Sequence, residues 1–194
     1  MKKTSKTKTI NETPVLRRMG IFNKAAVGAL ALLLGTGLSA LAGGNDNRAP
    51  EVPVEIAVPS GNKVHFHGFA VGFQIYTWDG LSWGRAVPQA TLFDDEGNIV
   101  ATHFAGPRWQ SNSGSIVLGT LAKPPITVDP NSIPWLLLSA VAAGTEGPGI
   151  FADTSFIQRV NTPGGNAPSA DGTVIGQVAP VPYTADYFFY RQTN

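Results

Sequence analysis

The chain has 194 residues, no cysteine and a formal net charge of +1. This near-neutral total combines a basic leader with a mildly acidic remainder: residues 1 to 24 carry a net charge of +6, and the rest of the chain carries −5. An acidic main part lacks the basic surface that nucleic-acid-binding proteins use, so we expect no nucleic-acid partner. Without cysteine there are no disulfides, and stability must come from the core of a single domain.

Residues 1 to 42 predict an export signal peptide. A basic region precedes a small-residue-rich apolar run from residue 25 to residue 42, which ends in a small-x-small cleavage pattern at Ala40-Leu41-Ala42. Glycine and alanine dilute the run and no basic stop-transfer segment follows, which favours cleavage over a membrane anchor. The pair Arg17-Arg18 favours the twin-arginine route, although two basic residues also suit the general secretory route. We therefore expect a periplasmic or extracellular protein with no stable membrane span after cleavage.

The mature chain is predicted to be mainly β. Residues 43 to 53 read as a linker, and residues 54 to 194 as one domain in which glycine and proline separate short apolar runs. About eight or nine strands at this spacing predict an antiparallel β-sandwich or barrel. The expected strands are 54–58, 63–76, 90–93, 99–104, 115–121, 135–142, 155–161, 173–178 and 184–191, with a hairpin turn at 94–98.

Two histidines stand one residue apart at the start of the second expected strand. Alternation places His65 and His67 on the same, more apolar face as Phe69, and Gly68 or Gly72 could mark a bulge that exchanges the faces. Two imidazoles on one face could bind Zn or Cu together with His103. The alternative, which we favour, is a pair of rim histidines bonded to backbone or water and a protein without a cofactor.

Residues 103 to 115 are expected to form one Gly/Pro-shaped loop that carries binding groups. Aromatic rings beside amide and guanidinium groups suit sugars, but the same rings also fill cores. Ser113 or Ser115 beside His103 allows an acyl-transfer hypothesis, which lacks a nucleophile elbow and an orienting acid. The candidate binding residues are His103, Arg108, Trp109, Trp78, Trp83, Gln74 and Tyr76.

Arg159 lies inside an apolar strand, on the face of Ile157. We expect it to form a structural ion pair with Asp186 of the last strand, which would clamp the two strands together.

Several segments in series resemble a secreted family of bacteria and filamentous fungi known as domain of unknown function 3455. The resemblance covers residues 50 to 194 and is carried by GFQIY (72–76), PQATLFD (88–94), HFAGPRW (103–109), GSIVLG (114–119), IPWLLL (133–138), IQRVNTPGGNAP (157–168) and VPYTADYFFY (181–190). The family has no established activity, so the resemblance implies compartment and architecture but no chemistry. It also implies a cysteine pair that Thr77-Trp78 and Ser169-Ala170-Asp171 replace here, which would place Trp78 next to the loop 163–171.

The functional expectation is a non-catalytic binding or envelope-associated protein whose ligand is a cell-wall or extracellular polysaccharide. The alternative is a metal-dependent or hydrolytic enzyme centred on His103. The sequence does not fix the oligomeric state.

Overall fold

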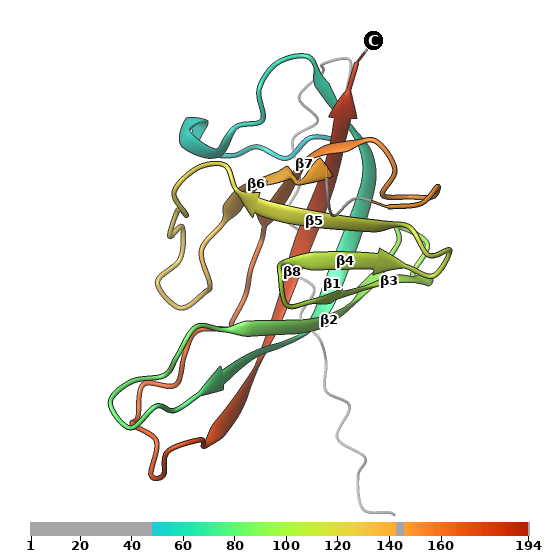
Figure 1. The fold of residues 1–194 in the computed structure, drawn as a ribbon. Helices are drawn as coiled ribbons and strands as arrows, with labels where there is room; N and C mark the ends of the chain where they lie inside the picture. Colours follow the sequence, from blue (N-terminus) through green and yellow to red (C-terminus); the bar gives the residue numbers. More distant parts are fainter. Residues whose placement is uncertain (1–47, 143–145, 194) are drawn as a thin grey trace, which may run out of the picture. The chain divides into compact units, whose positions relative to one another are not determined.

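The computed structural model describes residues 48–142 and 146–193, all within one compact unit (Figure 1). The predicted export signal and residues 43–47 of the predicted linker lie outside the described residues. Within the described ranges, no helix has the length and apolar character that a bilayer crossing requires.

Eight antiparallel strands close into a barrel in sequence order, with the first strand paired to the last. This confirms the mainly β prediction and selects the barrel over the sandwich. The strands are β1 (Asn62–Thr77), β2 (Val87–Phe93), β3 (Ile99–Phe104), β4 (Arg108–Ser111), β5 (Ile116–Leu121), β6 (Leu136–Ala140), β7 (Thr154–Val160) and β8 (Val178–Gln192).

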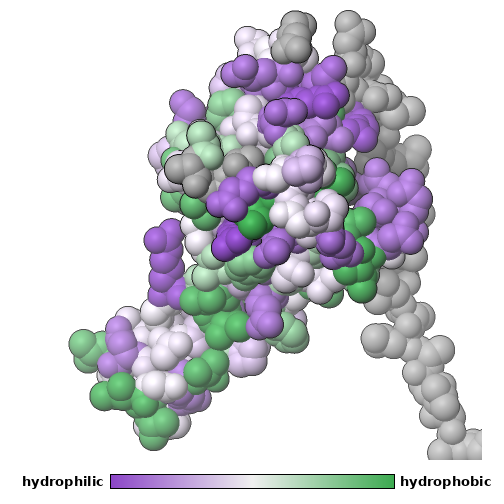
Figure 2. All heavy atoms as spheres, turned by 45° about the vertical axis from the view of Figure 1, so that its right-hand side comes forward, coloured by the Kyte–Doolittle hydropathy of each residue, from purple (hydrophilic) through white to green (hydrophobic). Residues whose placement is uncertain are grey.

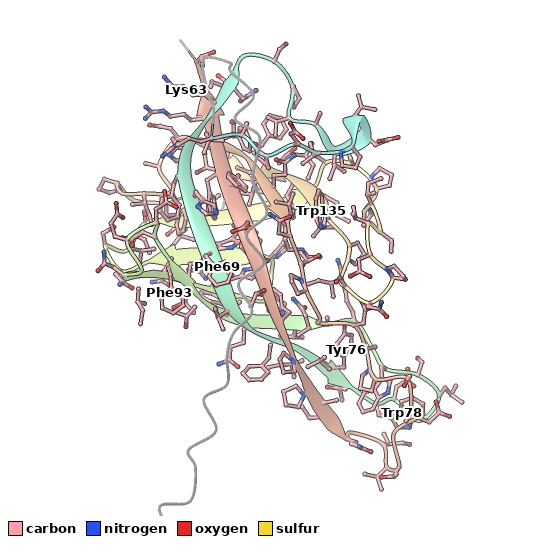
Figure 3. The ribbon with its side chains drawn as sticks, turned by 180° about the vertical axis from the view of Figure 1, so that it is seen from behind. Lys63, Phe69, Tyr76, Trp78, Phe93 and Trp135 are labelled. Carbon is pink, nitrogen blue, oxygen red and sulfur yellow. The ribbon has the colours of Figure 1, made fainter. Side chains whose placement is uncertain are left out.

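β1 and β8 are much longer than the other strands and continue beyond the barrel wall as an extension (Figure 1). Figure 3 follows β1 from Lys63 at one end of the barrel to Trp78 in the extension. The extension keeps free edges, where prolines are tolerated. The Pro182 carbonyl accepts a hydrogen bond from Gly165 N–H, so the backbone of Pro182 points away from β1. The missing N–H of this proline therefore costs no hydrogen bond between β1 and β8. One wall of the barrel therefore reaches past its open end.

The inner face of β1 carries small residues, which leaves room for large rings from other strands. Ala70 is fully buried, and the core contains Trp109, Phe151, Tyr187 and Phe189. The ring of Trp109 meets the edges of Tyr187 and Phe189 at centroid distances of 5.3 and 5.7 Å.

The more apolar face of β1 points outward. Phe69, Val71 and Phe73 are 40%, 45% and 44% exposed, although they share the predicted apolar face with His67. The bulge in β1 falls between Val64 and Phe66, not at the glycines. His65 therefore sits in the bulge, and its alternation with His67 is broken.

Three local predictions are wrong. Residues 54–58 form a 3-10 helix (Val54–Ile56) instead of a strand, because a closed barrel offers no free edge and the Ile56 carbonyl instead accepts from Gln158 Nε2 at 2.8 Å. Residues 173–177 form a turn, closed by Thr173 N–H donating to Gln177 Oε1. Residues 103–115 are not one loop, since they contain the four-residue strand β4 between two tight turns.

Candidate functional site

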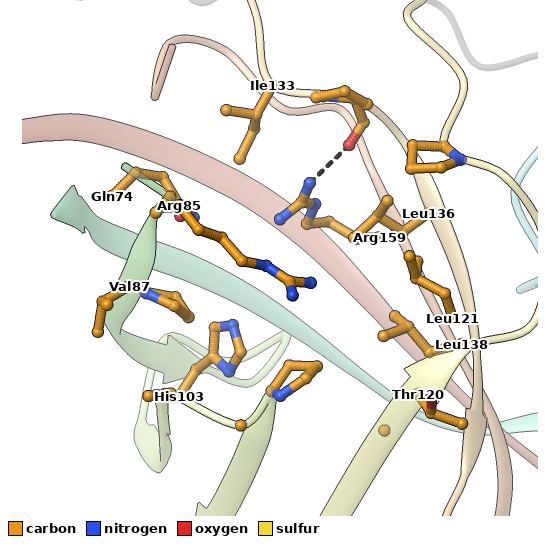
Figure 4. A pocket seen from close by; sticks show the side chains of 18 of the residues that line it. Gln74, Arg85, Val87, His103, Thr120, Leu121, Ile133, Leu136, Leu138 and Arg159 are labelled. Atoms are coloured by element: carbon orange, nitrogen blue, oxygen red, sulfur yellow. Dashed lines mark hydrogen bonds between the residues drawn. The ribbon is translucent and has the colours of Figure 1, made fainter. Parts of the chain in front are cut away.

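The open end of the barrel holds a pocket of about 690 Å³ (Figure 4). Its walls come from the part of β1 that enters the extension, the segment leading into β2, the β3–β4 turn, the end of β5 and strands β6 and β7. The lining residues are Gln74, Tyr76, Arg85, Ala86, Val87, Pro88, His103, Ala105, Gly106, Pro107, Gly119, Thr120, Leu121, Pro125, Ile133, Pro134, Leu136, Leu138 and Arg159. A volume of this size suits a small organic molecule.

His103 lies at the buried end of this pocket. Its ring is 2% exposed and stacks on Trp109 at a centroid distance of 4.4 Å. Nδ1–H donates to the Arg108 carbonyl at 2.9 Å, since a carbonyl can only accept, and this fixes the tautomer that leaves Nε2 as an acceptor. Burial, aided by the charge of Arg159, lowers the pKa of His103 to about 3, so the ring is neutral at physiological pH.

The predicted ion pair between Arg159 and Asp186 is not formed. Arg159 pairs with Tyr187 in the β7–β8 register and shares its inward face, whereas Asp186 points outward. Arg159 Nη2 donates to the Pro134 carbonyl at 2.7 Å, and its buried Nε has no hydrogen-bond partner within the described residues. Arg159 is therefore a pocket residue instead of a strand clamp.

Two predicted binding residues from β1 also line the pocket. The Tyr76 hydroxyl donates to the Gly165 carbonyl at 2.7 Å, while Gln74 is 3% exposed and its Nε2 finds no acceptor in the described part of the chain. The hydroxyls of Tyr183 and Tyr187, on the neighbouring inner face of β8, are also buried, and that of Tyr183 interacts with Tyr187 and Gln74. Polar atoms without partners therefore gather beside the pocket, although native interiors usually satisfy them.

The remaining predicted binding residues lie elsewhere. Trp109 is a core residue at 1% exposure, and Arg108 lies on the outer face with its guanidinium 5.4 Å from the Phe104 ring centroid. Trp78 is buried and meets Trp83 edge-on at 5.4 Å in the extension. The structure brings His103, Gln74 and Tyr76 together, but not these four.

The expected position of Trp78 agrees with the structure. Gly172 packs directly against its ring, and Trp83 Nε1–H donates to the Ala170 carbonyl at 2.9 Å. The segment that follows the Gly-Gly turn therefore does meet the end of β1.

The three histidines do not form a metal site. His65 Nε2 bonds to Thr154 Oγ1, and burial lowers its pKa to about 4. His67 lies on the outer face between Asp95 Oδ1 at 2.6 Å and Asp186 Oδ1 at 3.0 Å, which occupies both ring nitrogens. No group of three or more His, Cys, Asp or Glu side chains within the described ranges is arranged to hold a metal ion.

The serines proposed for acyl transfer bond to a third serine. Ser111 Oγ lies 2.9 Å from Ser113 Oγ and 2.8 Å from Ser115 Oγ, and Ser115 Oγ also accepts from Phe151 N–H. Neither candidate nucleophile is hydrogen-bonded to His103 in the described structure. This cluster holds the β4–β5 turn against the segment before β7.

Arg85 is the charged pocket residue that the sequence does not single out. It precedes β2 in an exposed segment with no motif, and only the closure of the barrel brings it opposite Arg159. The inward position of Arg159 follows from the alternation of side chains along β7. The pocket that Arg159 faces cannot be predicted from that alternation.

A family model, "Protein of unknown function (DUF3455)", matches residues 59–191. The chain belongs to this family, and the match spans the whole barrel from β1 to β8 except Gln192, the last residue of β8. No curated protein and no solved structure matches the chain.

Proposed function

We propose that this member of the family is an exported binding protein, without a catalytic role, that takes a small ligand into the open end of its barrel. The observation that carries the proposal is the pocket itself. It is largely apolar, it opens at one barrel end, and it collects buried polar atoms that no described residue satisfies. Sites for small molecules typically combine an apolar wall with a few convergent polar groups.

The pocket supports a small ligand better than a polysaccharide. Stacking on sugars needs exposed ring faces beside polar groups, whereas the predicted binding residues Trp78, Trp109 and Tyr76 are buried and Trp83 is half-buried. The family match adds no activity that would favour a particular polymer.

Geometry at His103 also favours binding over catalysis. The ring is buried and neutral, a backbone carbonyl occupies Nδ1, and no carboxylate lines the pocket to act as a partner acid or base. General acid–base work needs a group whose pKa lies near the operating pH, and that of His103 is far below it.

Binding in the pocket can be tested with a neutral apolar fluorophore such as Nile red. Ala105 is exposed and lines the pocket, so Ala105→Trp should fill the mouth without disturbing the core. We expect this variant to bind about tenfold more weakly than the wild type, since displacing ligand atoms from an apolar site costs roughly 0.8 kcal/mol per methylene. Ala57→Trp, at an exposed position outside the pocket, is the matched control. Equal affinity of Ala105→Trp and wild type would place the fluorophore elsewhere and contradict the proposal.

Export can be tested by mass spectrometry of the protein recovered from the host. The leader predicts a mature chain that begins at Gly43 and is found in the periplasmic or extracellular fraction. A full-length chain retained in the cytoplasm would contradict this part of the proposal.

A further inference from the structure

We infer that the ligand is an amphipathic organic anion, with a carboxylate-type head held by Arg85 and Arg159 and an apolar body lying along the barrel wall. This inference rests on the proposed function and specifies the class of its ligand.

The charge of the pocket is positive and uncompensated. Arg85 and Arg159 both line it, from the segment before β2 and from β7, and Figure 4 shows both guanidinium groups extending into it. None of the lining residues is aspartate or glutamate. Within the described structure Arg85 forms no hydrogen bond or ion pair, and Arg159 has only the Pro134 carbonyl. Arg159 is half-buried with a buried Nε, and a cation partly removed from water without a counter-charge is costly, so a bound anion would offset that cost.

The neighbouring polar atoms are mostly donors. Gln74 and Arg159 both line the pocket, and Gln74 Nε2 and Arg159 Nε are buried without acceptors within the described residues. A carboxylate has two oxygens and no proton to donate, and its planar shape matches a guanidinium fork. A site rich in unpaired donors therefore selects an acceptor-rich, negatively charged head.

The rest of the pocket selects an apolar body. Val87, Leu121, Ile133, Leu136 and Leu138 supply aliphatic wall around the two arginines. An inorganic anion would fill only a small part of the roughly 690 Å³ volume and leave this wall in contact with water. An organic acid uses both parts of the pocket.

The test compares dansylaminoundecanoic acid with its methyl ester, which has the same apolar body without the charge. We expect the wild type to bind the acid about tenfold more tightly than the ester, because charge-assisted hydrogen bonds are roughly twice as strong as neutral ones. Arg85→Gln should remove most of this preference, because it should weaken binding of the acid much more than binding of the ester. Arg85 is exposed, so this variant should fold normally. Arg159→Gln should do the same, and a thermal melt of each variant reports its folding.

Arg191→Gln is the matched control. This variant removes the same charge from an exposed position near the C-terminal end of β8, away from the extension. It should keep the full preference for the acid. Equal binding of acid and ester by the wild type would overturn the anion inference but leave a pocket that binds apolar ligands. An acid preference that survives in both Arg85→Gln and Arg159→Gln would overturn the assignment to these arginines. Binding of neither compound would contradict the proposed function together with the inference.

Discussion

Each of the three histidines has a different environment, and each environment has a consequence that can be measured. His67 lies between two carboxylates on the outer face and stacks on Phe188 at 4.5 Å. The hydrogen bond to Asp186, with a smaller contribution from Asp95, raises its pKa above the ordinary 6.5 despite partial burial. His67 therefore links β1, the β2–β3 turn and β8 most strongly when it is protonated.

The clamp at His67 should make stability depend on pH. A raised pKa means that its contribution is complete below about pH 6.5 and is lost as the pH rises through the higher folded value. We expect His67→Gln to lower the free energy of unfolding by about 0.5 to 1 kcal/mol at pH 5.5, because Asp95 is solvent-exposed and the pairs are screened. The difference should shrink at pH 9. Urea denaturation of both proteins at the two pH values measures it, and a difference that grows with pH would contradict the account.

His103 should behave in the opposite way. Its lowered pKa means that its neutral form supports the fold above pH 6.5, and that this support is lost as the pH falls toward about 3. We expect its ring resonances to stay constant between pH 5 and pH 8 in an NMR titration, with the proton on Nδ1. Titration of His103 within that range, or a proton on Nε2, would contradict a buried ring whose Nδ1–H donates to the Arg108 carbonyl.

At the level of the strand, β1 shows that a pattern of apolar residues does not by itself tell which face of the strand points into the barrel. Its inner face is lined by Gly68, Ala70 and Gly72, and its outer face by larger apolar side chains. The inner face is the one on which β1 and β2 approach each other too closely for larger side chains. A Cβ on Gly72 would lie 2.5 Å from Ala90 Cα on the paired strand. The small residues of β1 are therefore the ones that the packing of the barrel requires.

Gly72→Ala should be destabilising although alanine is small. Because the obstructing atoms belong to the backbone of β2, the strands would have to separate, and overpacking of this kind costs roughly 1 to 3 kcal/mol. Val71→Ala, at the adjacent outward position, is the control and should change stability by less than about 1 kcal/mol. Thermal denaturation of both variants checks this, and a larger loss for Val71→Ala would place the outer face in the core.

Seven of the eight strands could be predicted from alternation and turn residues, although residues 54–58 and 173–178 are wrongly predicted as strands, and three features could not be predicted. β4 was missed because four residues between two turns are too short to show a period. The partner of Arg159 was wrong because the register of β8 against β7, which puts Asp186 on the other face, is set by contacts far apart in the chain. His67 was placed on a strand face, yet its two carboxylates come from distant segments.

For the whole molecule, closure of the barrel is what creates a site. The pairing of β1 with β8 is not visible in any local pattern, and it distinguishes the barrel from the sandwich. Closure brings Arg85, His103 and Arg159 to one opening from separate segments, which explains why candidates chosen by local sequence gave only part of the pocket.

The outer surface offers a competing place for an apolar ligand. Figure 2 shows hydrophobic atoms at the tip of the extension, where Leu81, Val174 and Ile175 are 91%, 63% and 78% exposed. A shallower apolar hollow of about 470 Å³ also lies on the outer side, between β1 and the loop at Pro163. A direct test must therefore report position as well as affinity.

Chemical-shift mapping with decanoate on isotopically labelled mature protein reports both the position of the ligand and its affinity. We expect saturable shifts concentrated on the pocket lining, with the largest at Gln74, Thr120 and Ile133 and little change at Val71, Leu81 or Ile175. Shifts confined to the outer face of β1 and the extension, or none under conditions in which decanoate remains soluble, would contradict a ligand site inside the barrel.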